Sequence, residues 1–134
     1  MKVANGVNQT LGRGAAGRVY LAVHKPTNRK IAVKEINFLD VNKRAQLRKE
    51  LITLISHQSR FLVKSYGAFY DDKGRVHVTL EYMDRGSLAD VIARRGKIPE
   101  KVVVTIAEHC LRGLHFLHSN HILHRDVKLS LIHI

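Results

Sequence analysis

The residues in this sequence that suggest chemistry are a lysine, two carboxylates and a second lysine, spread along the chain. Lys34 lies in a short apolar segment, and Glu50 lies on the apolar side of the helix predicted to follow it. A lysine held by a helix carboxylate can direct its ammonium group at the phosphates of a nucleotide. Asp126, which ends a His-Arg-Asp run, can orient a hydroxyl group and accept its proton, with Lys128 near the transferred phosphate. The pattern predicts phosphoryl transfer.

A glycine-rich segment precedes Lys34. Residues 12–19 fit the pattern G-x-G-x-x-G-x-V between two expected strands, whereas the dinucleotide-binding fingerprint opens a helix. Glycines let the backbone approach a phosphate closely. The segment alone also fits a flexible hairpin tip, and Lys34 alone also fits a solubilising residue of an edge strand. The order of glycine-rich turn, lysine, helix carboxylate and His-Arg-Asp run favours phosphate chemistry.

These residues need a framework of strands followed by helices. Apolar residues alternate after the glycine-rich turn, and β-branched or alternating segments predict further strands at 31–36, 66–70 and 76–82. Residues 41–55 have a helical period instead. Ser87, with Asp90 three residues later, predicts the capped start of a short helix. A longer helix should begin near Pro99 and end near Ser119.

Composition limits the alternatives. The chain has 134 residues and 45% apolar content, which suits one small domain, and its single cysteine, Cys110, excludes an internal disulfide. Cys110 lies on a helical apolar stripe, so we expect a buried small hydrophobe. No apolar run approaches the ~20 residues of a membrane span, and the N-terminus has no signal-peptide core. We therefore expect a cytoplasmic protein without membrane partners.

The net charge of +12 raises the question of nucleic-acid binding. The 23 lysines and arginines are spread as singles and pairs, without a long basic run or interleaved stacking aromatics, so we predict no nucleic-acid partner. His115, His118, His121 and His124 recur every three residues. Two ligands on one helical face need a spacing of four, so we predict no metal site there.

With these motifs in order, the sequence resembles a eukaryotic protein kinase over about residues 8–128. Segments 66–70, 81–88, 98–100 and 124–128 are most similar to mitogen-activated protein kinase kinases, which are dual-specificity enzymes. The resemblance implies an α+β fold. Its N-lobe, about residues 8–82, would hold a five-stranded antiparallel sheet plus the αC helix. A hinge at 83–86 and the first C-lobe helices, within 87–128, would follow.

The resemblance also implies a binding site for ATP. It assigns catalytic roles to Asp126 as base, to Lys128, and to Lys34 paired with Glu50. The residues that it places around the nucleotide are Leu11, Gly12, Arg13, Gly14, Gly17, Val19, Ala32, Lys34, Leu80, Glu81, Met83, Ser87 and Asp90. Among these, Leu80 would be the gatekeeper, the backbone at Glu81 and Met83 would bind adenine, and Ser87 and Asp90 would lie near ribose.

The sequence departs from the family after Lys128. The family continues Pro-Ser-Asn-Ile-Leu, whereas this chain reads Leu-Ser-Leu-Ile-His-Ile, which puts Leu131 at the place of the magnesium-binding asparagine. Mg²⁺ is expected for a whole kinase, but its ligands are missing here, so we expect this chain to be inactive by itself. We interpret 129–134 as a non-native tail on a kinase truncated in its catalytic loop, because transposon adapters used in sequencing libraries encode the same six residues. A natural truncated pseudokinase or scaffold without phosphoryl transfer is the alternative.

The resemblance further implies partners. The substrate would be a downstream mitogen-activated protein kinase, phosphorylated on threonine and tyrosine of its activation loop, and an upstream kinase would activate the parent enzyme. The sequence leaves the oligomeric state open.

Overall fold

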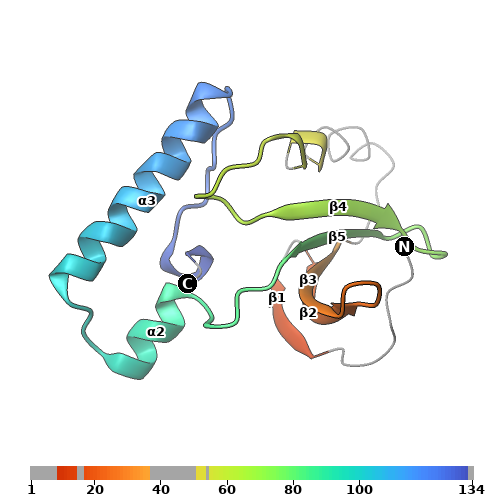
Figure 1. Ribbon diagram of the computed structural model, residues 1–134, viewed down its shortest axis with the longest axis horizontal. Coiled ribbons are helices and arrows are strands. Elements are labelled where there is room, and N and C mark those ends of the chain that lie inside the picture. Colours follow the sequence, from red (N-terminus) through yellow and green to blue (C-terminus); the bar gives the residue numbers. More distant parts are fainter. Residues whose placement is uncertain (1–8, 15–16, 37–50, 54, 133–134) are drawn as a thin grey trace. The chain divides into compact units, whose positions relative to one another are not determined.

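The computed structural model describes residues 9–14, 17–36, 51–53 and 55–132 (Figure 1). The chain divides into two compact units. The first runs to Gln58 and includes Val63–Tyr82, and the second combines Ser59–Leu62 with Met83–Ile134. Most of the helix predicted for residues 41–55 lies outside the described residues, Glu50 included, although residues 51–53 and 55–56 are helical.

The first unit is built on a five-stranded antiparallel sheet (Figure 1). Its strands are β1 (Thr10–Gly14), β2 (Gly17–His24), β3 (Arg29–Ile36), β4 (Ser65–Tyr70) and β5 (Val76–Glu81), in the spatial order β1-β2-β3-β5-β4. The strands predicted at 31–36, 66–70 and 76–82 are confirmed, with ends that differ by one or two residues. The five-stranded antiparallel sheet that the sequence predicts for this part of the chain is confirmed.

The core of this unit follows from the central position of β3 and β5. Val33 has no exposed surface, and Val76 and Val78 are 1% exposed. On β5 the polar residues His77 and Thr79 are buried as well, so both faces of this strand are covered. In a strand that is paired on both sides, the backbone N–H and C=O groups form hydrogen bonds with the two neighbouring strands. The β-branched side chains of such a strand suit the pleated surface of the sheet.

The second unit contains helix α2 (Leu88–Arg95), helix α3 (Glu100–Ser119) and the short 3-10 helix η2 (Leu129–Leu131). The predicted cap is confirmed: Ser87 and Asp90 form a capping box at the start of α2. The predicted limits of the longer helix are confirmed too, since Pro99 precedes its first residue and Ser119 is its last. η2 contacts α2, where the Leu88 backbone N–H donates to the Ile132 carbonyl oxygen at 2.7 Å.

The apolar stripe of α3 is less buried than its sequence suggests. All residues of α3 are described, and Gly113 alone among them is buried. Cys110 is half-buried, so the expectation of a buried cysteine is wrong. The reason is that Ser59–Leu62 covers α3 only around Gly113, where an added Cβ would lie 3.1 Å from the Phe61 carbonyl oxygen. Within the described part of the chain, no helix is long and apolar enough to cross a membrane.

Candidate functional site

The glycine-rich segment forms the hairpin between β1 and β2. Gly14 pairs with Gly17 and Gly12 pairs with Val19, after an irregularity in register between Thr10 and Gly12. Gly17 has φ +128°, a conformation that residues with a Cβ rarely adopt. An added Cβ would also overlap the Glu35 carbonyl oxygen of β3 and lie 3.1 Å from its carbonyl carbon. This position therefore needs glycine for two independent reasons.

Sheet register brings four of the predicted site residues together. Lys34 of β3 lies opposite Val19 of β2, and Ala32, two residues earlier on the same strand, lies opposite Leu80 of β5. Side chains two apart on a strand share a face, and paired residues share it too, so these four lie on one face of the sheet. Ala32 is only 8% exposed. The arrangement puts an apolar surface beside a cation, which suits a planar base joined to phosphates.

The partner predicted for Lys34 is Glu50, which lies outside the described residues. The Lys34–Glu50 ion pair therefore stays a prediction, as do the roles of all the site residues named above.

Two reciprocal hydrogen bonds fix the end of β5. The Glu81 backbone N–H donates to the Lys64 carbonyl oxygen at 2.9 Å, and the Lys64 N–H donates to Glu81 Oε1 at 2.6 Å. Met83, whose backbone is predicted to bind adenine with that of Glu81, is the first residue after the first unit. The backbone that is predicted to bind adenine thus begins at Glu81, where two hydrogen bonds to Lys64 hold the end of β5.

Ser87 and Asp90, predicted to lie near ribose, contact each other. The Asp90 Oδ2 atom accepts from the Ser87 backbone N–H at 2.8 Å and from the Ser87 hydroxyl at 2.6 Å. The Asp90 N–H donates in turn to Ser87 Oγ at 3.2 Å. A carboxylate at the start of a helix also suits the positive end of the helix dipole. Their positions are therefore explained by helix capping, and contact with ribose stays a prediction.

The His-Arg-Asp segment lies on the surface of the second unit. Lys128 Nζ and Asp126 Oδ2 form an ion pair at 2.9 Å, and the Asp126 N–H donates to His124 Nδ1 at 3.3 Å. Arg125, which lies between His124 and Asp126 in the sequence, has φ +63°, a left-handed conformation that turns the backbone sharply. The structure thus brings together the predicted base and the predicted phosphate-binding lysine.

The comparisons with known proteins agree with this geometry. The model of the protein kinase domain family matches residues 6–133. The chain belongs to the protein kinase family. It is 42% identical over 123 residues to mitogen-activated protein kinase kinase 3 of Arabidopsis thaliana, covering 88% of this chain and 23% of that protein.

Other relatives of the kinase have similar names. The chain is 43% identical over 125 residues to mitogen-activated protein kinase kinase 1c of Physcomitrium patens, covering 90% of this chain and 36% of the relative. It is 42% identical over 125 residues to the dual specificity mitogen-activated protein kinase kinase 1 of Dictyostelium discoideum, covering 91% of this chain and 19% of that protein. The chain therefore spans about a fifth to a third of the curated relatives that it matches.

The residues that the structure describes do not form a magnesium site of the kinase type. Leu131, at the place of the expected asparagine, has no oxygen or nitrogen donor in its side chain. Among the described residues, no three histidine, cysteine, aspartate or glutamate side chains lie close enough together to hold a metal ion. Mg²⁺ prefers several oxygen ligands in octahedral geometry. The described part of this kinase therefore does not fit the ion.

Sequence reasoning missed a polar network on the opposite face of the sheet. His77 is 4% exposed, and its Nδ1 lies 3.1 Å from the Tyr20 hydroxyl while its Nε2 lies 3.1 Å from Asp71 Oδ2. The Arg75 guanidinium pairs with Asp71 at 2.6 Å and with Glu35 at 3.1 Å. Tyr20 and Glu35 directly follow Val19 and Lys34 in the sequence. The network therefore joins the two strands that carry the kinase's predicted phosphate-binding residues.

The network shifts the ionisation of its members. Partial burial of Asp71 opposes its ionisation, but hydrogen bonds from the Arg75 backbone, His77, the Arg75 guanidinium and the Lys73 backbone outweigh it and hold the Asp71 pKa well below its usual value. Burial, and then the charge of Glu35, raises the pKa of Tyr20. A hydrogen bond to Asp71 raises the pKa of Arg75. The only sequence signal for this cluster is the acidic turn before β5, which did not reveal its partners.

Proposed function

We propose that the chain is the nucleotide-binding lobe and the start of the C-lobe of a mitogen-activated protein kinase kinase. The whole enzyme would transfer the γ-phosphoryl group of ATP to threonine and tyrosine in the activation loop of a downstream kinase, and an upstream kinase would activate it in the cytoplasm. The observation that carries the proposal is the register that sets Val19 beside Lys34 and Ala32 beside Leu80 on one face. The names of the relatives support the subfamily.

The proposed roles follow from the chemistry of the side chains. Lys34 would bind the α- and β-phosphates below the glycine-rich hairpin. Asp126 would accept the proton of the substrate hydroxyl while the hydroxyl oxygen attacks the γ-phosphorus of ATP. The bond between the γ-phosphorus and the oxygen that bridges it to the β-phosphate would break, and ADP would leave. Lys128, paired with Asp126 at 2.9 Å, would lie near the transferred phosphate.

We propose domain limits for the kinase that agree with the division of the structure after Tyr82 but differ from it at Ser59–Leu62, which belongs to the second unit. An N-lobe of about residues 8–82, a hinge at 83–86 and a C-lobe portion at 87–128 fit the boundary between Tyr82 and Met83. For residues 129–134, the hypothesis of a non-native tail stands beside two facts: the family model extends to residue 133, and Ile132 accepts a hydrogen bond from Leu88. The nucleotide sequence tests it, because codons unlike those of the adapter would contradict a foreign origin.

The first experiment recovers the transcript beyond the codon for Lys128. We expect an asparagine three residues after Lys128 and an Asp-Phe-Gly motif further on, since phosphoryl transfer depends on a bound metal. A natural transcript that reads Leu131 and lacks the Asp-Phe-Gly motif would contradict the kinase and favour the pseudokinase or scaffold. The 134-residue chain itself should show little or no thermal shift with ATP and magnesium, because Leu131 supplies no ligand to the metal.

The second experiment measures transfer by the longer enzyme to a catalytically inactive mitogen-activated protein kinase, with separate detection of phosphothreonine and phosphotyrosine. Asp126→Asn should lower the rate by about 10²–10⁴-fold, the usual contribution of a general base. Lys34→Met should lower it strongly as well. Lys30→Met is the matched control, because Lys30 is an exposed lysine of the same strand. Equal activity of the Lys34 and Lys30 variants would contradict the proposed site.

A further inference from the structure

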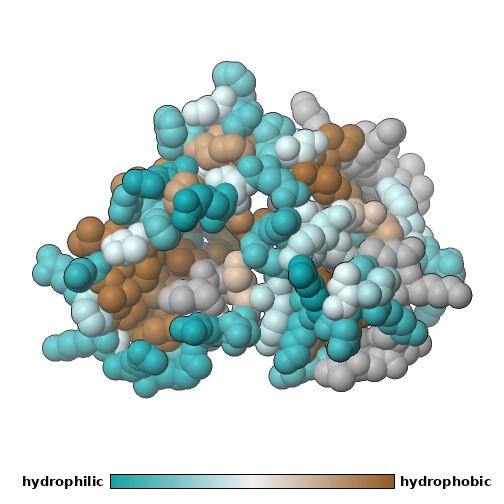
Figure 2. Space-filling view, viewed as in Figure 1, coloured by the Kyte–Doolittle hydropathy of each residue, from teal (hydrophilic) through white to brown (hydrophobic). Residues whose placement is uncertain are grey.

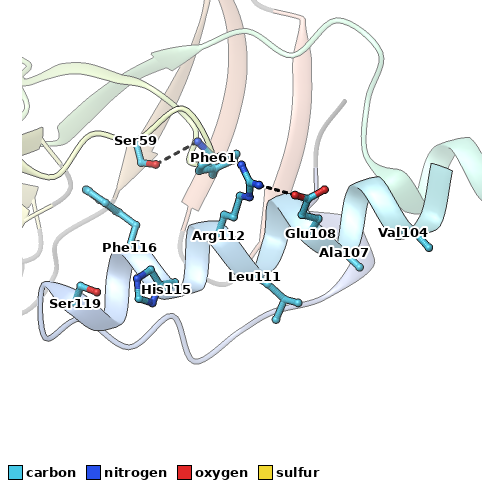
Figure 3. A pocket seen from close by; sticks show the side chains of 10 residues that line it. All are labelled: Ser59, Phe61, Val104, Ala107, Glu108, Leu111, Arg112, His115, Phe116 and Ser119. Atoms are coloured by element: carbon cyan, nitrogen blue, oxygen red, sulfur yellow. Dashed lines mark hydrogen bonds and ion pairs between the residues drawn. The ribbon is translucent and has the colours of Figure 1, made fainter. Parts of the chain in front are cut away.

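An open apolar groove of about 810 Å³ lies in the second unit, between α3 and the segment that contains Phe61 (Figure 3). Figure 2 shows apolar side chains gathered where α2 and α3 lie in Figure 1. Because the chain spans about a fifth to a third of the relatives that it matches, this open face does not identify a partner. The polar network of the first unit differs from the groove, because its members contact one another within one sheet.

The Tyr20 side chain joins two strands that are not neighbours in the sheet. Tyr20 of β2 lies opposite Val33 of β3, and β3 separates β2 from β5. The Tyr20 hydroxyl nevertheless lies 3.1 Å from Nδ1 of His77 on β5. The Tyr20 ring packs against the buried cluster that contains Val33, which fixes the path of the side chain over β3. Backbone hydrogen bonds join adjacent strands only, so this contact adds a link that the strand ladders do not supply.

The direction of each hydrogen bond in this link follows from its neighbours. Although desolvation opposes the ionisation of Asp71, hydrogen bonds from Arg75 and His77 hold its pKa well below its usual value, so Asp71 is a carboxylate that only accepts. Nε2 of His77, 3.1 Å from Asp71 Oδ2, therefore carries the proton, and Nδ1 accepts from the Tyr20 hydroxyl. Burial raises the pKa of Tyr20, which keeps that hydroxyl protonated. This arrangement satisfies both ring nitrogens of His77.

His77 is a fixed point in the sheet. It is 4% exposed, and its ring stacks on Phe69 of β4 with the ring centres 5.1 Å apart. Asp71, one of its hydrogen-bond partners, accepts from the Arg75 backbone N–H at 2.9 Å and from Arg75 Nε at 2.7 Å. Arg75 also pairs with Glu35 of β3 at 3.1 Å. Contacts from β3, β4 and the turn between β4 and β5 thus hold this ring in place.

The glycine-rich hairpin depends on this link for its angle. β1 is the edge strand, so among the described strands the hairpin is joined to the rest of the sheet by the ladder between β2 and β3 alone. The twist between paired strands varies over roughly 10–35°, and a change in twist would move the hairpin relative to β3. Val19 and Tyr20 are consecutive and point to opposite faces, and Val19 lies opposite Lys34. Holding Tyr20 on one face therefore sets the position of Val19 beside Lys34 on the other.

We propose that Tyr20 and His77 are positioning residues for nucleotide binding, because their hydrogen bond fixes the angle of the glycine-rich hairpin over Lys34. Both side chains lie on the face opposite Lys34, so they act through β2 and do not touch the nucleotide. The inference rests on the proposed function, since it explains how this chain would hold its hairpin over the phosphates of ATP. Without the link, ATP would have to draw the hairpin into place, and its binding would weaken.

The test measures the Michaelis constants of the longer enzyme for ATP and for its protein substrate. Tyr20→Phe keeps the ring against Val33 and removes only the hydroxyl. We expect KM for ATP to rise about three- to tenfold, the range that one neutral hydrogen bond supplies. The kcat at saturating ATP and KM for the protein substrate should change less than about twofold, because bound ATP then holds the hairpin. An unchanged KM for ATP would overturn the proposal.

Thr79→Val is the matched control, because it removes another buried hydrogen bond of a hydroxyl on the same face of the sheet. Thr79 is 2% exposed and donates to the Gly67 carbonyl oxygen at 2.9 Å, which joins β5 to β4 and not to the hairpin. Thr79→Val should lower the urea midpoint about as much as Tyr20→Phe and leave KM for ATP within about twofold of the parent value. Equal increases in KM for ATP would show a general loss of stability and overturn the positioning role.

A double substitution tests whether the Tyr20 hydroxyl acts through His77. His77→Met keeps a side chain of similar size and removes both ring nitrogens. In this background, Tyr20→Phe should raise KM for ATP by less than about twofold, since the partner of the hydroxyl is already gone. A full three- to tenfold increase in that background would overturn the assignment. If circular dichroism shows that His77→Met does not fold, the comparison of Tyr20→Phe with Thr79→Val still decides the proposal.

Two measurements separate this inference from the proposed function. Amide hydrogen exchange of the 134-residue chain needs no nucleotide. Tyr20→Phe should speed exchange of the paired amides of β1 by about threefold or more, and Thr79→Val should not; equal exchange in the two variants would overturn the inference. In the longer enzyme, equal activity of Lys34→Met and Lys30→Met would overturn the proposed site and this inference with it. A strong loss in Lys34→Met with an unchanged KM for ATP in Tyr20→Phe would overturn the positioning role alone.

Discussion

Replacing Gly17 by alanine should destabilise this chain more than the same change at any other glycine of the sheet that the structure describes. A left-handed or similar φ costs about 1–3 kcal/mol for a residue with a Cβ, and Gly17 has φ +128°. The new Cβ would also overlap the Glu35 carbonyl oxygen, so β2 and β3 must separate locally. Overpacking of this kind costs a further ~1–3 kcal/mol. We expect a total loss of about 2–6 kcal/mol in the free energy of unfolding.

Two other glycines separate strain from overlap. Gly67 has φ +143° but no atom within 4 Å of an added Cβ, so Gly67→Ala should cost only the backbone strain, about 1–3 kcal/mol. Gly12 has neither a positive φ nor a neighbour within 4 Å. Gly12→Ala should therefore stabilise the strand slightly, by about 0.5–1 kcal/mol, because alanine loses less conformational freedom on folding.

The assay is urea unfolding of the 134-residue chain and its three variants, followed by circular dichroism, with amide hydrogen exchange at β2 and β3 as a local readout. The expected order of stability is Gly12→Ala, parent chain, Gly67→Ala, Gly17→Ala. A Gly17→Ala variant as stable as Gly12→Ala would refute the reasoning, because neither the strain nor the overlap would then exist. If Gly17→Ala does not fold, the order of the other two variants still tests the strain argument.

Further variants test other parts of the structure. Ser87→Ala should remove the side chain that accepts from the Asp90 N–H and cost about 0.5–2 kcal/mol, measured as a lower urea midpoint, with Ser87→Asp restoring most of it. Asp71→Asn should reduce the dependence of the free energy of unfolding on pH in acid, measured by urea unfolding at several pH values. Because the pKa of Asp71 is lowered on folding, its carboxylate stabilises the fold above about pH 4, and this contribution is lost as the pH falls through the lowered pKa. A pH dependence in acid identical to that of the parent chain would contradict this. Thr79→Val should cost about 0.5–1.5 kcal/mol in the free energy of unfolding, because the hydroxyl of the buried Thr79 donates to the Gly67 carbonyl oxygen at 2.9 Å. An unchanged urea midpoint would show that this hydrogen bond contributes nothing.

Much of the fold and part of the site could be predicted because their signals are local. The capping box at Ser87 needs only two residues three apart, and structure and sequence agree on it. The strands between Gly17 and Ile36 and the limits of α3 likewise follow from alternation, turn residues and a proline within a few positions. The glycine-rich segment, Lys34, Glu50 and the His-Arg-Asp run, taken in that order, indicated the family.

The burial of α3 could not be predicted. An apolar stripe indicates which face of a helix is favoured for burial, but not whether another part of the chain packs against that face. Ser59–Leu62 reaches α3 near Gly113, and Leu111 remains 66% exposed. The groove between these two elements therefore belongs to the tertiary structure alone.

The sequence by itself determined the order of the elements, the family, and which residue types are available for chemistry, because each of these depends on neighbours along the chain. Only the tertiary structure decided that Ala32 faces Leu80 and that Lys34 lies beside Val19, since a slip of one residue would have turned every side chain to the other face. It also decided that His77 meets Tyr20, 57 positions away. Contacts at that separation depend on how strands pair, and pairing is selected by the packing of the whole sheet.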